Sequence, residues 1–313
     1  MPQNIESIID RINIEINGQS LQSANNLNYV YNLLLPVSTG YDGKVKRSVY
    51  AGAGDQTNPT ANLSDEHFCI QQFLGFLGEC SPDVLDTSLL GNVRITIQLA
   101  NTNIMIKASP DGPTSASYTL NNIYWTCDTI SIDDGVFCPL HQQFLSSGGI
   151  YEIPSSSYYT SLFSSATMNQ SSRFSLSTGS LDWVLGAFPT AYNTLSAVNT
   201  TTGRGAQFDT ELTGLTSYSF KINNIQYPQY TAGINDTYVL AMNGLNLTQD
   251  PTNGISPKIT QATWKQGFGF ALQKFNLDAQ PGERVLSGIN SLGTNMTVSF
   301  NVLDDKNIPL LVY

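Results

Sequence analysis

Each of the two histidines lies close to a cysteine, the pairing that a thiol nucleophile and its general base require. His67 precedes Cys69 by two residues, and His141 follows Cys138 by three. Residues i and i+2 do not face each other on a helix, so the first pair is predicted to be a surface histidine beside a core thiol. The second pair has only the acidic residues 133–134 nearby, and local spacing does not assemble the three or four ligands of a zinc site. We therefore predict no catalytic residue and no metal ligand here.

Three further patterns fall short of the sites that they resemble. Asp133-Asp134-Gly135 lacks the spaced ligands of a calcium loop and is predicted to be a turn before a helix. Gly52-Ala53-Gly54 is followed neither by a further glycine nor by the Gly-Lys-Ser/Thr of a phosphate-binding loop. The chain has no Gly-x-Ser-x-Gly motif of a hydrolase. Paired carboxylates meet only in three dimensions and stay open, but the sequence predicts no enzyme and no cofactor.

Charged residues are sparse, and their balance is acidic. They make up 12% of the 313 residues, about half the usual share, with 14 Lys and Arg against 24 Asp and Glu and a net charge of −10. The one dense basic group, Lys44, Lys46 and Arg47, follows an Asp-Gly turn and is predicted to be the rim of a hairpin. A protein that grips phosphates needs a clustered basic face, so direct nucleic-acid binding is not expected.

The four cysteines, at positions 69, 80, 127 and 138, form no C-x-x-C pair and are too few for a disulfide framework. We expect free thiols in a reducing compartment. No stretch approaches 18 consecutive apolar residues, which argues against a transmembrane helix, and residues 1–10 lack the pattern of a signal peptide.

The elements that would have to position any site are predicted to be mostly short strands. Alternating apolar residues and turn signals, such as Asn17-Gly18, indicate an all-β chain of sandwiches or barrels with a few short helices. A dense apolar run, Tyr29–Leu35, is stopped by Pro36. The expected strands span residues 12–16, 45–50, 93–99, 118–130, 150–153, 174–177, 183–188, 218–227, 268–275, 284–286, 296–303 and 310–313, and the expected helices span residues 3–11, 64–78, 139–145 and 237–245.

Two pairs of segments indicate an internal duplication. Tyr118–Trp125 and Phe220–Tyr227 share an Asn-Asn-Ile centre at an offset of 102 residues, and a short helix is predicted after each. More weakly, Arg173–Phe188 resembles Arg284–Phe300 at an offset of about 111 residues. The alternation of apolar residues changes parity at Asn-Asn, which predicts a bulge or a strand buried on both faces.

These segments, with Ser180-Leu-Asp-Trp-Val-Leu185 and the closing Leu286–Phe300, resemble the double-jelly-roll major capsid proteins of tailless icosahedral viruses, the lineage of tectiviruses, adenoviruses and polinton-like elements. The resemblance extends over most of the chain. It lies in the order and spacing of the segments and not in a set of invariant residues. It implies two tandem eight-stranded jelly-roll barrels, a homotrimeric, pseudo-hexameric capsomer that tiles the virion shell, and minor capsid or penton proteins as partners. It also implies a possible contact of an N-terminal helix, residues 3–11, with an internal membrane on the inner face.

We place the boundary between the two barrels near residue 190, which gives domains of residues 1–190 and 191–313. Sparse surface charge and long uncharged loops at 51–64, 155–172 and 193–206 favour a trimer in which loops clasp neighbouring subunits. The alternative is a viral spike, fibre or carbohydrate-binding jelly-roll module, in which exposed Tyr158, Tyr159 and Trp264 stack on sugars. A jelly-roll enzyme is the third hypothesis, which the scarcity of histidine disfavours.

Overall fold

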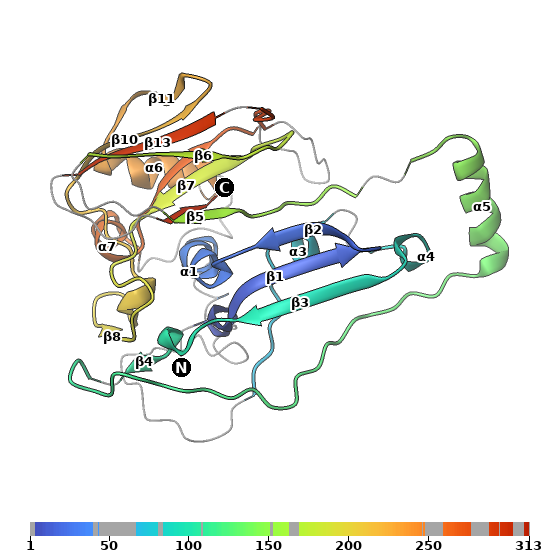
Figure 1. Ribbon diagram of the computed structural model, residues 1–313, viewed down its shortest axis with the longest axis horizontal. Helices are drawn as coiled ribbons and strands as arrows, with labels where there is room; N and C mark the ends of the chain where they lie inside the picture. The colour runs from blue at the N-terminus through green and yellow to red at the C-terminus, as the bar shows by residue number, and fades with distance from the viewer. Residues whose placement is uncertain are drawn as a thin grey trace.

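The computed structural model describes residues 4–39, 43, 67–80, 84–107, 109–150, 153–162, 169–245, 247, 259–276, 288–293, 295–302 and 310–312. Figure 1 shows two β-rich parts side by side, one from each half of the chain, with the helix α1 (Leu27–Ser38) near the junction between them. A second helix, α5 (Asp134–Ser146), stands apart from both.

The C-terminal part is built from two four-stranded antiparallel sheets, in the orders β6-β13-β10-β11 and β5-β14-β7-β12. Numbered along the chain as strands one to eight, these are the orders 2-7-4-5 and 1-8-3-6, which define an eight-stranded jelly roll. The strands are β5 (Thr160–Leu162), β6 (Asn169–Ser175), β7 (Trp183–Ala187), β10 (Leu215–Ile222), β11 (Ile225–Ala232), β12 (Ala271–Lys274), β13 (Asn295–Val302) and β14 (Leu310–Val312).

This pairing does not agree with a domain boundary at residue 190. Strands β5, β6 and β7 precede residue 190 and pair with β14, β13 and β12, which follow it. The two segments of the weaker predicted repeat, Arg173–Phe188 and Arg284–Phe300, also lie next to each other in this one roll, since Phe174 of β6 pairs with Met296 of β13. They do not occupy equivalent places in two barrels. The roll therefore begins near residue 160, and residues 1–190 and 191–313 do not divide its sheets.

An aromatic cluster fills the space between the two sheets. Phe300 of β13 lies edge-on to Phe188, with ring centroids 4.9 Å apart, and to Phe220 of β10 at 6.3 Å. All three rings are buried; Phe220 and Phe300 alternate along β10 and β13 with less buried residues, and Phe188 follows directly after β7. Gly186 of β7 faces the ring of Phe300 so closely that a Cβ atom there would overlap Phe300 Cζ. The absence of a side chain at Gly186 is what lets the Phe300 ring enter the core.

Strands β10 and β11 meet at a two-residue turn. Asn223 and Asn224 both take left-handed backbone angles, with φ of 49° and 66°, and Ile222 pairs with Ile225 across them. This is the geometry of a type I′ hairpin, which asparagine tolerates better than most residues. The predicted bulge or doubly buried strand at Asn-Asn is therefore wrong in this segment, because a two-residue turn reverses the parity of the apolar pattern just as a bulge does.

Two helices between β11 and β12 cover one end of the roll. The first is α6 (Ile234–Gly244), which agrees with the helix predicted at 237–245, and the second is α7 (Gln261–Gly267), which was not predicted. Trp264 of α7 is fully buried, packs on Phe270 with ring centroids 4.7 Å apart, and donates its indole N–H to Thr237 Oγ1 at 3.1 Å. This contact anchors both helices to the core.

The N-terminal part contains a three-stranded antiparallel sheet of order β2-β1-β3. A short 3₁₀ helix η1 (Ile5–Ile8) precedes β1 (Ile9–Ile16), which turns at Asn17-Gly18 into β2 (Gln19–Ala24) and also pairs with β3 (Val93–Leu99). The predicted turn and the predicted strand at 93–99 are confirmed. The predicted helix at 3–11 is wrong, because residues 9–11 alternate with the strand pattern of β1 rather than continuing η1.

Helix α1 joins the two parts into one core. The helix continues through Pro36 to Ser38, so the predicted stop at Pro36 falls two residues early. Its Tyr29 stacks on Tyr192, with ring centroids 4.9 Å apart, and accepts a hydrogen bond from the Asn193 N–H at 2.7 Å. Since Tyr192 lies between strands of the roll and α1 packs on β1, the buried residues of both parts form one continuous cluster.

Two other predicted elements are wrong. Described residues 67–74, expected to be helical, have no regular structure and lead only into the short α3 (Phe76–Glu79); residues 118–130, expected to be a strand, form none. Helix α5 does form over the predicted helix at 139–145 and starts earlier. The remaining elements are α4 (Thr87–Leu90), η2 (Thr102–Ile104), η3 (Ala206–Phe208) and a small sheet of β4 (Ile106–Lys107), β8 (Ser196–Asn199) and β9 (Arg204–Gly205).

Candidate assembly surfaces

The histidine and cysteine residues that suggested nucleophilic chemistry do not form a thiol site. His67 and Cys69 both lie in an irregular segment and are exposed, so the expected core position of Cys69 is wrong. His141 is directed at Asp86, with its Nδ1 3.7 Å from Asp86 Oδ2, and its ring meets that of Phe137 edge-on. Within the described ranges, no group of three or more His, Cys, Asp and Glu side chains is placed to hold a metal ion.

The acidic turn before α5 caps the N-terminus of the helix. Asp133 is the N-cap residue, and its Oδ1 accepts the Gly135 N–H at 2.9 Å, which satisfies one of the free amides of the first turn. The prediction of a turn before a helix is confirmed. The basic group Lys44, Lys46 and Arg47 and the glycines at 52 and 54 lie outside the described residues.

The aromatic residues proposed to stack on sugars are mostly buried. Trp264 is 0% exposed, as described above, and Tyr158 is buried with its hydroxyl donating to Glu79 Oε1 at 2.7 Å. Burial, and after it the Glu79 carboxylate, raises the pKa of Tyr158 well above its usual value. Only Tyr159 of the three is exposed. The expected sugar-binding use of these residues is therefore wrong for Tyr158 and Trp264, which hold the core together.

The N-terminal segment packs against the subunit over residues 5–7. Ile5, Glu6 and Ser7 are buried in η1, and the amide of Asn32 in α1 donates to Ser7 Oγ at 2.7 Å. No helix in the described part of the chain has the length and apolarity that crossing a bilayer requires.

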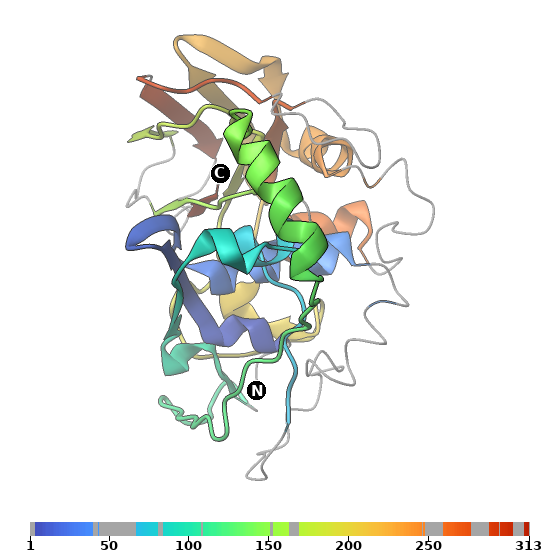
Figure 2. The same ribbon diagram turned by 90° about the vertical axis from the view of Figure 1, so that its right-hand side faces the viewer.

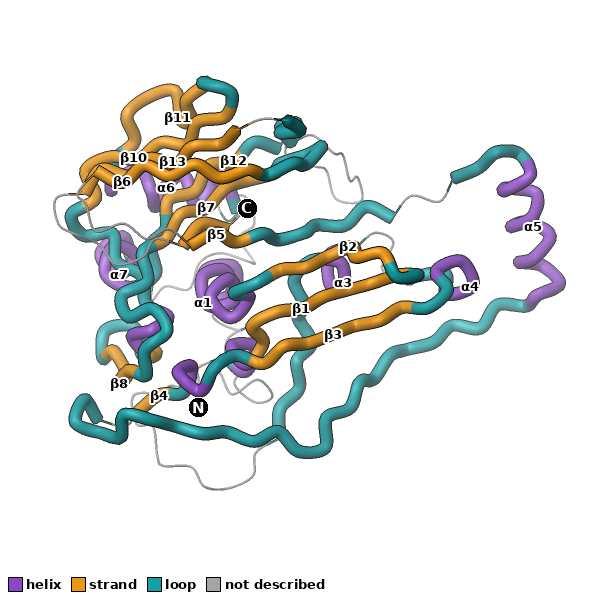
Figure 3. The backbone as a smooth tube through the Cα atoms, viewed as in Figure 1, coloured by secondary structure: helices purple, strands orange, loops and turns teal. Residues whose placement is uncertain are grey.

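Many large apolar side chains are exposed instead on the segment from residue 121 to residue 150, which we call the apolar arm. All side chains from Asn121 to Asp133 are exposed, Tyr124 by 84%. Figure 1 shows the arm running below β3 to α5 and continuing from α5 toward β5, and in Figure 2 α5 lies in front of the rest of the molecule. Figure 3 shows that the chain on either side of α5 is loop. The large exposed apolar residues of the arm are Ile123, Tyr124, Trp125, Ile130, Ile132, Val136, Leu140, Phe144, Leu145 and Ile150.

Helix α5 carries its exposed apolar side chains in register. Val136, Leu140 and Phe144 are spaced by four residues and so lie on one face of the helix. The adjoining side, with Phe137 and His141, is more covered and includes the contact with Asp86. The arm therefore contacts its own subunit next to the exposed apolar stripe.

Strand β3 forms a second apolar surface. It pairs with β1 along one edge, and no strand among the described residues pairs with its other edge. Val93, Ile97 and Leu99 share one face of β3 and are exposed, whereas Ile12 and Ile9, which pair with Ile97 and Leu99 on β1, are buried. The apolar face of this sheet is therefore only half covered.

The loops that were predicted to clasp neighbours contain strands where they are described. Residues 193–206 carry β8 and β9, and residues 155–172 include β5 and the start of β6. Residues 51–64 lie outside the described chain. Of the four cysteines, all are free thiols, as expected, and Cys127 and Cys138 lie on the apolar arm.

Comparisons with known proteins identify the fold. No protein-family model matches the sequence, and no curated protein matches it. Among solved structures, the crystal structure of VP54 of PBCV-1, fitted into a cryo-EM reconstruction of the virophage Sputnik, is 12% identical with a TM-score of 0.51, covering 100% of this chain and 81% of that chain. A quasi-atomic model of the PBCV-1 virus capsid is 11% identical with a TM-score of 0.43, covering 100% of this chain and 80% of that one. The resemblance inferred from the sequence is thus confirmed at the level of fold: this chain, along its whole length, folds like VP54.

Proposed function

We propose that this chain is a major capsid protein that forms the shell of an icosahedral virion and has no enzymatic role. The observation that carries this proposal is the likeness of the whole chain to VP54, a protein fitted into the reconstruction of a virus particle. Fold alone does not determine function, so the composition of the subunit surface is a second line of support for the proposal. Sparse charge and a large exposed apolar arm are features of a subunit that is covered in an assembly.

The subunit is proposed to be a homotrimer of double jelly rolls, which gives a six-cornered capsomer that packs against neighbouring capsomers. The second roll is the one formed by β5–β7 and β10–β14. The first is proposed to be built on β1, β2 and β3, with the boundary between Ile150 and Thr160 rather than at residue 190. Minor capsid and penton proteins are the further partners that such a shell needs. With a net charge of −10, the subunit is expected to leave genome binding to other proteins.

The test is the state of the purified protein. Native mass spectrometry of the full chain is expected to give a species of three times 34.1 kDa, and electron microscopy of the concentrated protein or of virions is expected to show six-cornered capsomers in a closed shell. A monomer that persists at high protein concentration and gives no particles would overturn the capsid proposal. Salt-sensitive, submicromolar binding of DNA would overturn the expectation about the genome.

A further inference from the structure

The segment Tyr118–Trp125 runs beside the free edge of β3 in its own chain, and we call this segment the strap. The hydroxyl group of Tyr118 donates a hydrogen bond to the carbonyl oxygen of Ala100, the residue that follows β3. Beyond the other end of the strap, Nδ1 of His141 in α5 lies 3.7 Å from Oδ2 of Asp86, which precedes β3. The strap therefore passes β3 in the antiparallel direction, and Figures 1 and 3 show it below that strand.

The length of the strap matches that of β3 if one of its residues forms a β-bulge. Strand β3 has 7 residues, Val93–Leu99, and the strap has one more. In a bulge, two residues of one strand oppose a single residue of its neighbour, so the strap can span all of β3. Asn122 has a left-handed φ of 54°, the angle of the first residue in the bulge type that usually contains glycine, and asparagine tolerates this angle better than most residues. The strap therefore already contains the backbone angle that a bulge at residues 122–123 requires.

The bulge brings the apolar residues of the strap to the apolar face of β3. Without a bulge, the alternation of apolar and polar residues changes parity at Asn121-Asn122, so Leu120 and Ile123 would lie on opposite faces. With a bulge, four residues of the strap oppose the four residues that share one face of β3, starting next to the contact with Ala100. The pairs are Tyr118 with Leu99, Leu120 with Ile97, Ile123 with Ile95, and Trp125 with Val93. Tyr124 then lies opposite Arg94, where an aromatic ring and a guanidinium group attract each other.

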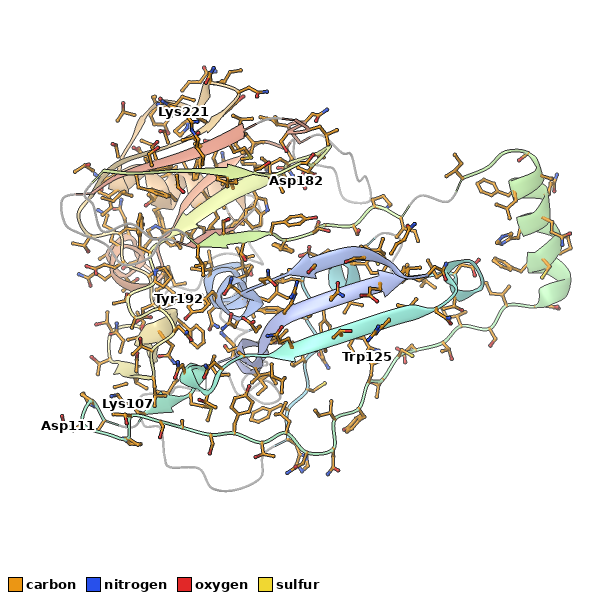
Figure 4. All side chains as sticks on the ribbon, in the orientation of Figure 1. Lys107, Asp111, Trp125, Asp182, Tyr192 and Lys221 are labelled. Carbon is orange, nitrogen blue, oxygen red and sulfur yellow. The ribbon has the colours of Figure 1, made fainter. Side chains whose placement is uncertain are left out.

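The strap is open in this structure, although both of its ends are anchored. All side chains of residues 121–125 are exposed, and three of the β3 residues that the strap would oppose are between 40% and 44% exposed. The ring of Trp125, which lies below β3 in Figure 4, contacts Phe73 with ring centroids 5.1 Å apart, and Phe73 packs on the hydrophobic core. A shift of residues 119–124 between these anchors covers apolar side chains of both segments. It also gives hydrogen-bond partners to the edge of β3, which pairs with no other strand in the described part of the chain.

We propose that the strap closes onto β3 of the same chain as a bulged antiparallel strand and extends the three-stranded sheet to four strands. The open position of this structure and the closed position exchange with each other. The closed position covers the apolar face that β3 exposes. Because no second molecule takes part, strap closure can be tested on the monomer and does not depend on the proposed capsid function.

The first test traps the closed strap with a disulfide. Directly opposed residues of an antiparallel pair have Cβ atoms about 4.5–5.5 Å apart, close to the separation in a disulfide. The starting chain has serine at each of the exposed natural cysteines, at positions 69, 127 and 138, and keeps the buried Cys80.

In this chain, the pair Leu120→Cys and Ile97→Cys is expected to oxidise within one chain, as mass spectrometry of the non-reduced protein would show. The control pair is Thr119→Cys and Ile97→Cys, whose side chains would point to opposite faces of the sheet and which is expected to oxidise about tenfold more slowly. Equal rates for the two pairs, or disulfides that form mainly between chains, would overturn strap closure.

The second test identifies the bulge. In the bulged arrangement Tyr124 lies opposite Arg94, whereas in a straight strand that starts with Tyr118 opposite Leu99, Ile123 would lie opposite Arg94. The pair Tyr124→Cys and Arg94→Cys is therefore expected to oxidise faster than the pair Ile123→Cys and Arg94→Cys. The reverse order would show a straight strand and overturn the proposed pairing.

The third test changes the backbone preference at Asn122 in the chain with cysteines at positions 120 and 97. Asn122→Gly is expected to leave the rate of oxidation unchanged, because glycine adopts the left-handed angle readily. Asn122→Val is expected to slow oxidation about tenfold, because a β-branched residue disfavours that angle in the closed strap. Equal rates with glycine and with valine at this position would overturn the bulge at Asn122.

Discussion

A methyl group added at Gly186 is expected to destabilise the jelly roll through the ring of Phe300. A Cβ atom at this position would lie 3.1 Å from Phe300 Cε1 and closer still to Cζ. The ring cannot move aside, because Phe188 lies edge-on to it at 4.9 Å and Phe220 at 6.3 Å, and all three are buried. Gly186 also lies in the middle of its sheet, between Ala271 of β12 and Leu311 of β14, so the backbone has little freedom to shift.

The expected cost follows from overpacking. Inserting one methyl group into a close-packed core typically costs about 1–3 kcal/mol, and the β propensity that alanine gains over glycine in a strand offsets only part of it. For a roll of this size, each kcal/mol lowers the melting temperature by roughly 2–4 °C. A smaller residue at position 300 leaves room for the methyl group. We therefore expect Gly186→Ala to be much better tolerated when it is combined with Phe300→Leu, with a coupling energy of about 1–2 kcal/mol.

The assay is thermal and urea unfolding of the four proteins of this double-mutant cycle at one protein concentration, since association changes apparent stability. Gly179→Ala is the matched control, because Gly179 has no atom within 4 Å of its added Cβ and its backbone angle is not left-handed. It should melt at the same temperature as the unmodified chain. If Gly186→Ala costs the same with Phe300 and with Leu at that position, the contact between the two residues is not the cause and the packing argument is refuted.

Three further outcomes are expected. Thr237→Val should cost about 1–3 kcal/mol in urea unfolding because the buried Trp264 Nε1–H loses its acceptor, whereas Thr237→Ser should cost much less. Asn224→Ala should cost about 1–2 kcal/mol because Asn224 is left-handed, and Asn224→Gly should cost nothing; equal melting of the two would contradict the assigned turn. Burial raises the pKa of Asp182, so the folded protein binds its proton more tightly than the unfolded chain and loses stability as the pH rises through the raised pKa. Asp182→Asn should accordingly melt higher than the unmodified protein at neutral pH and equally below pH 3.8, and a difference that is constant with pH would exclude this cause.

The sequence pattern predicted an element correctly where neighbouring residues alone determine its backbone conformation. Asn17-Gly18 predicts a hairpin because its left-handed angles are cheap for these two residues, and both angles are observed. The alternation of Val93, Ile95, Ile97 and Leu99 with polar residues predicts β3, because successive side chains of a strand point to opposite faces of the sheet. At Asn223-Asn224 two structures reverse the apolar parity equally, so the sequence alone could not distinguish a bulge from a turn.

The sequence did not predict which aromatic side chains are buried. Trp264 sits on a short helix whose orientation is set by the roll beneath it, and its indole N–H finds Thr237 only after α6 is in place. Tyr158 is hidden by Glu79, which lies 79 residues earlier. The same limit applies to the apolar arm: residues 118–130 have the composition of a strand, but a strand also needs a partner edge, and composition does not reveal whether that edge is on the same chain.

Because of the order of its strands, the roll can be completed only after the last strands have been synthesised. The last two strands of the roll occupy inner places: β13 lies between β6 and β10, and β14 between β5 and β7. While a ribosome is still translating residues before 295, β5 and β6 have no neighbour to pair with, and the roll stays open. Contacts of such long sequence separation form late and slowly. A growing chain on a polysome therefore does not present a finished roll to its neighbours, and chains cut short before residue 310 are exposed to chaperones and proteases instead of being built into a shell.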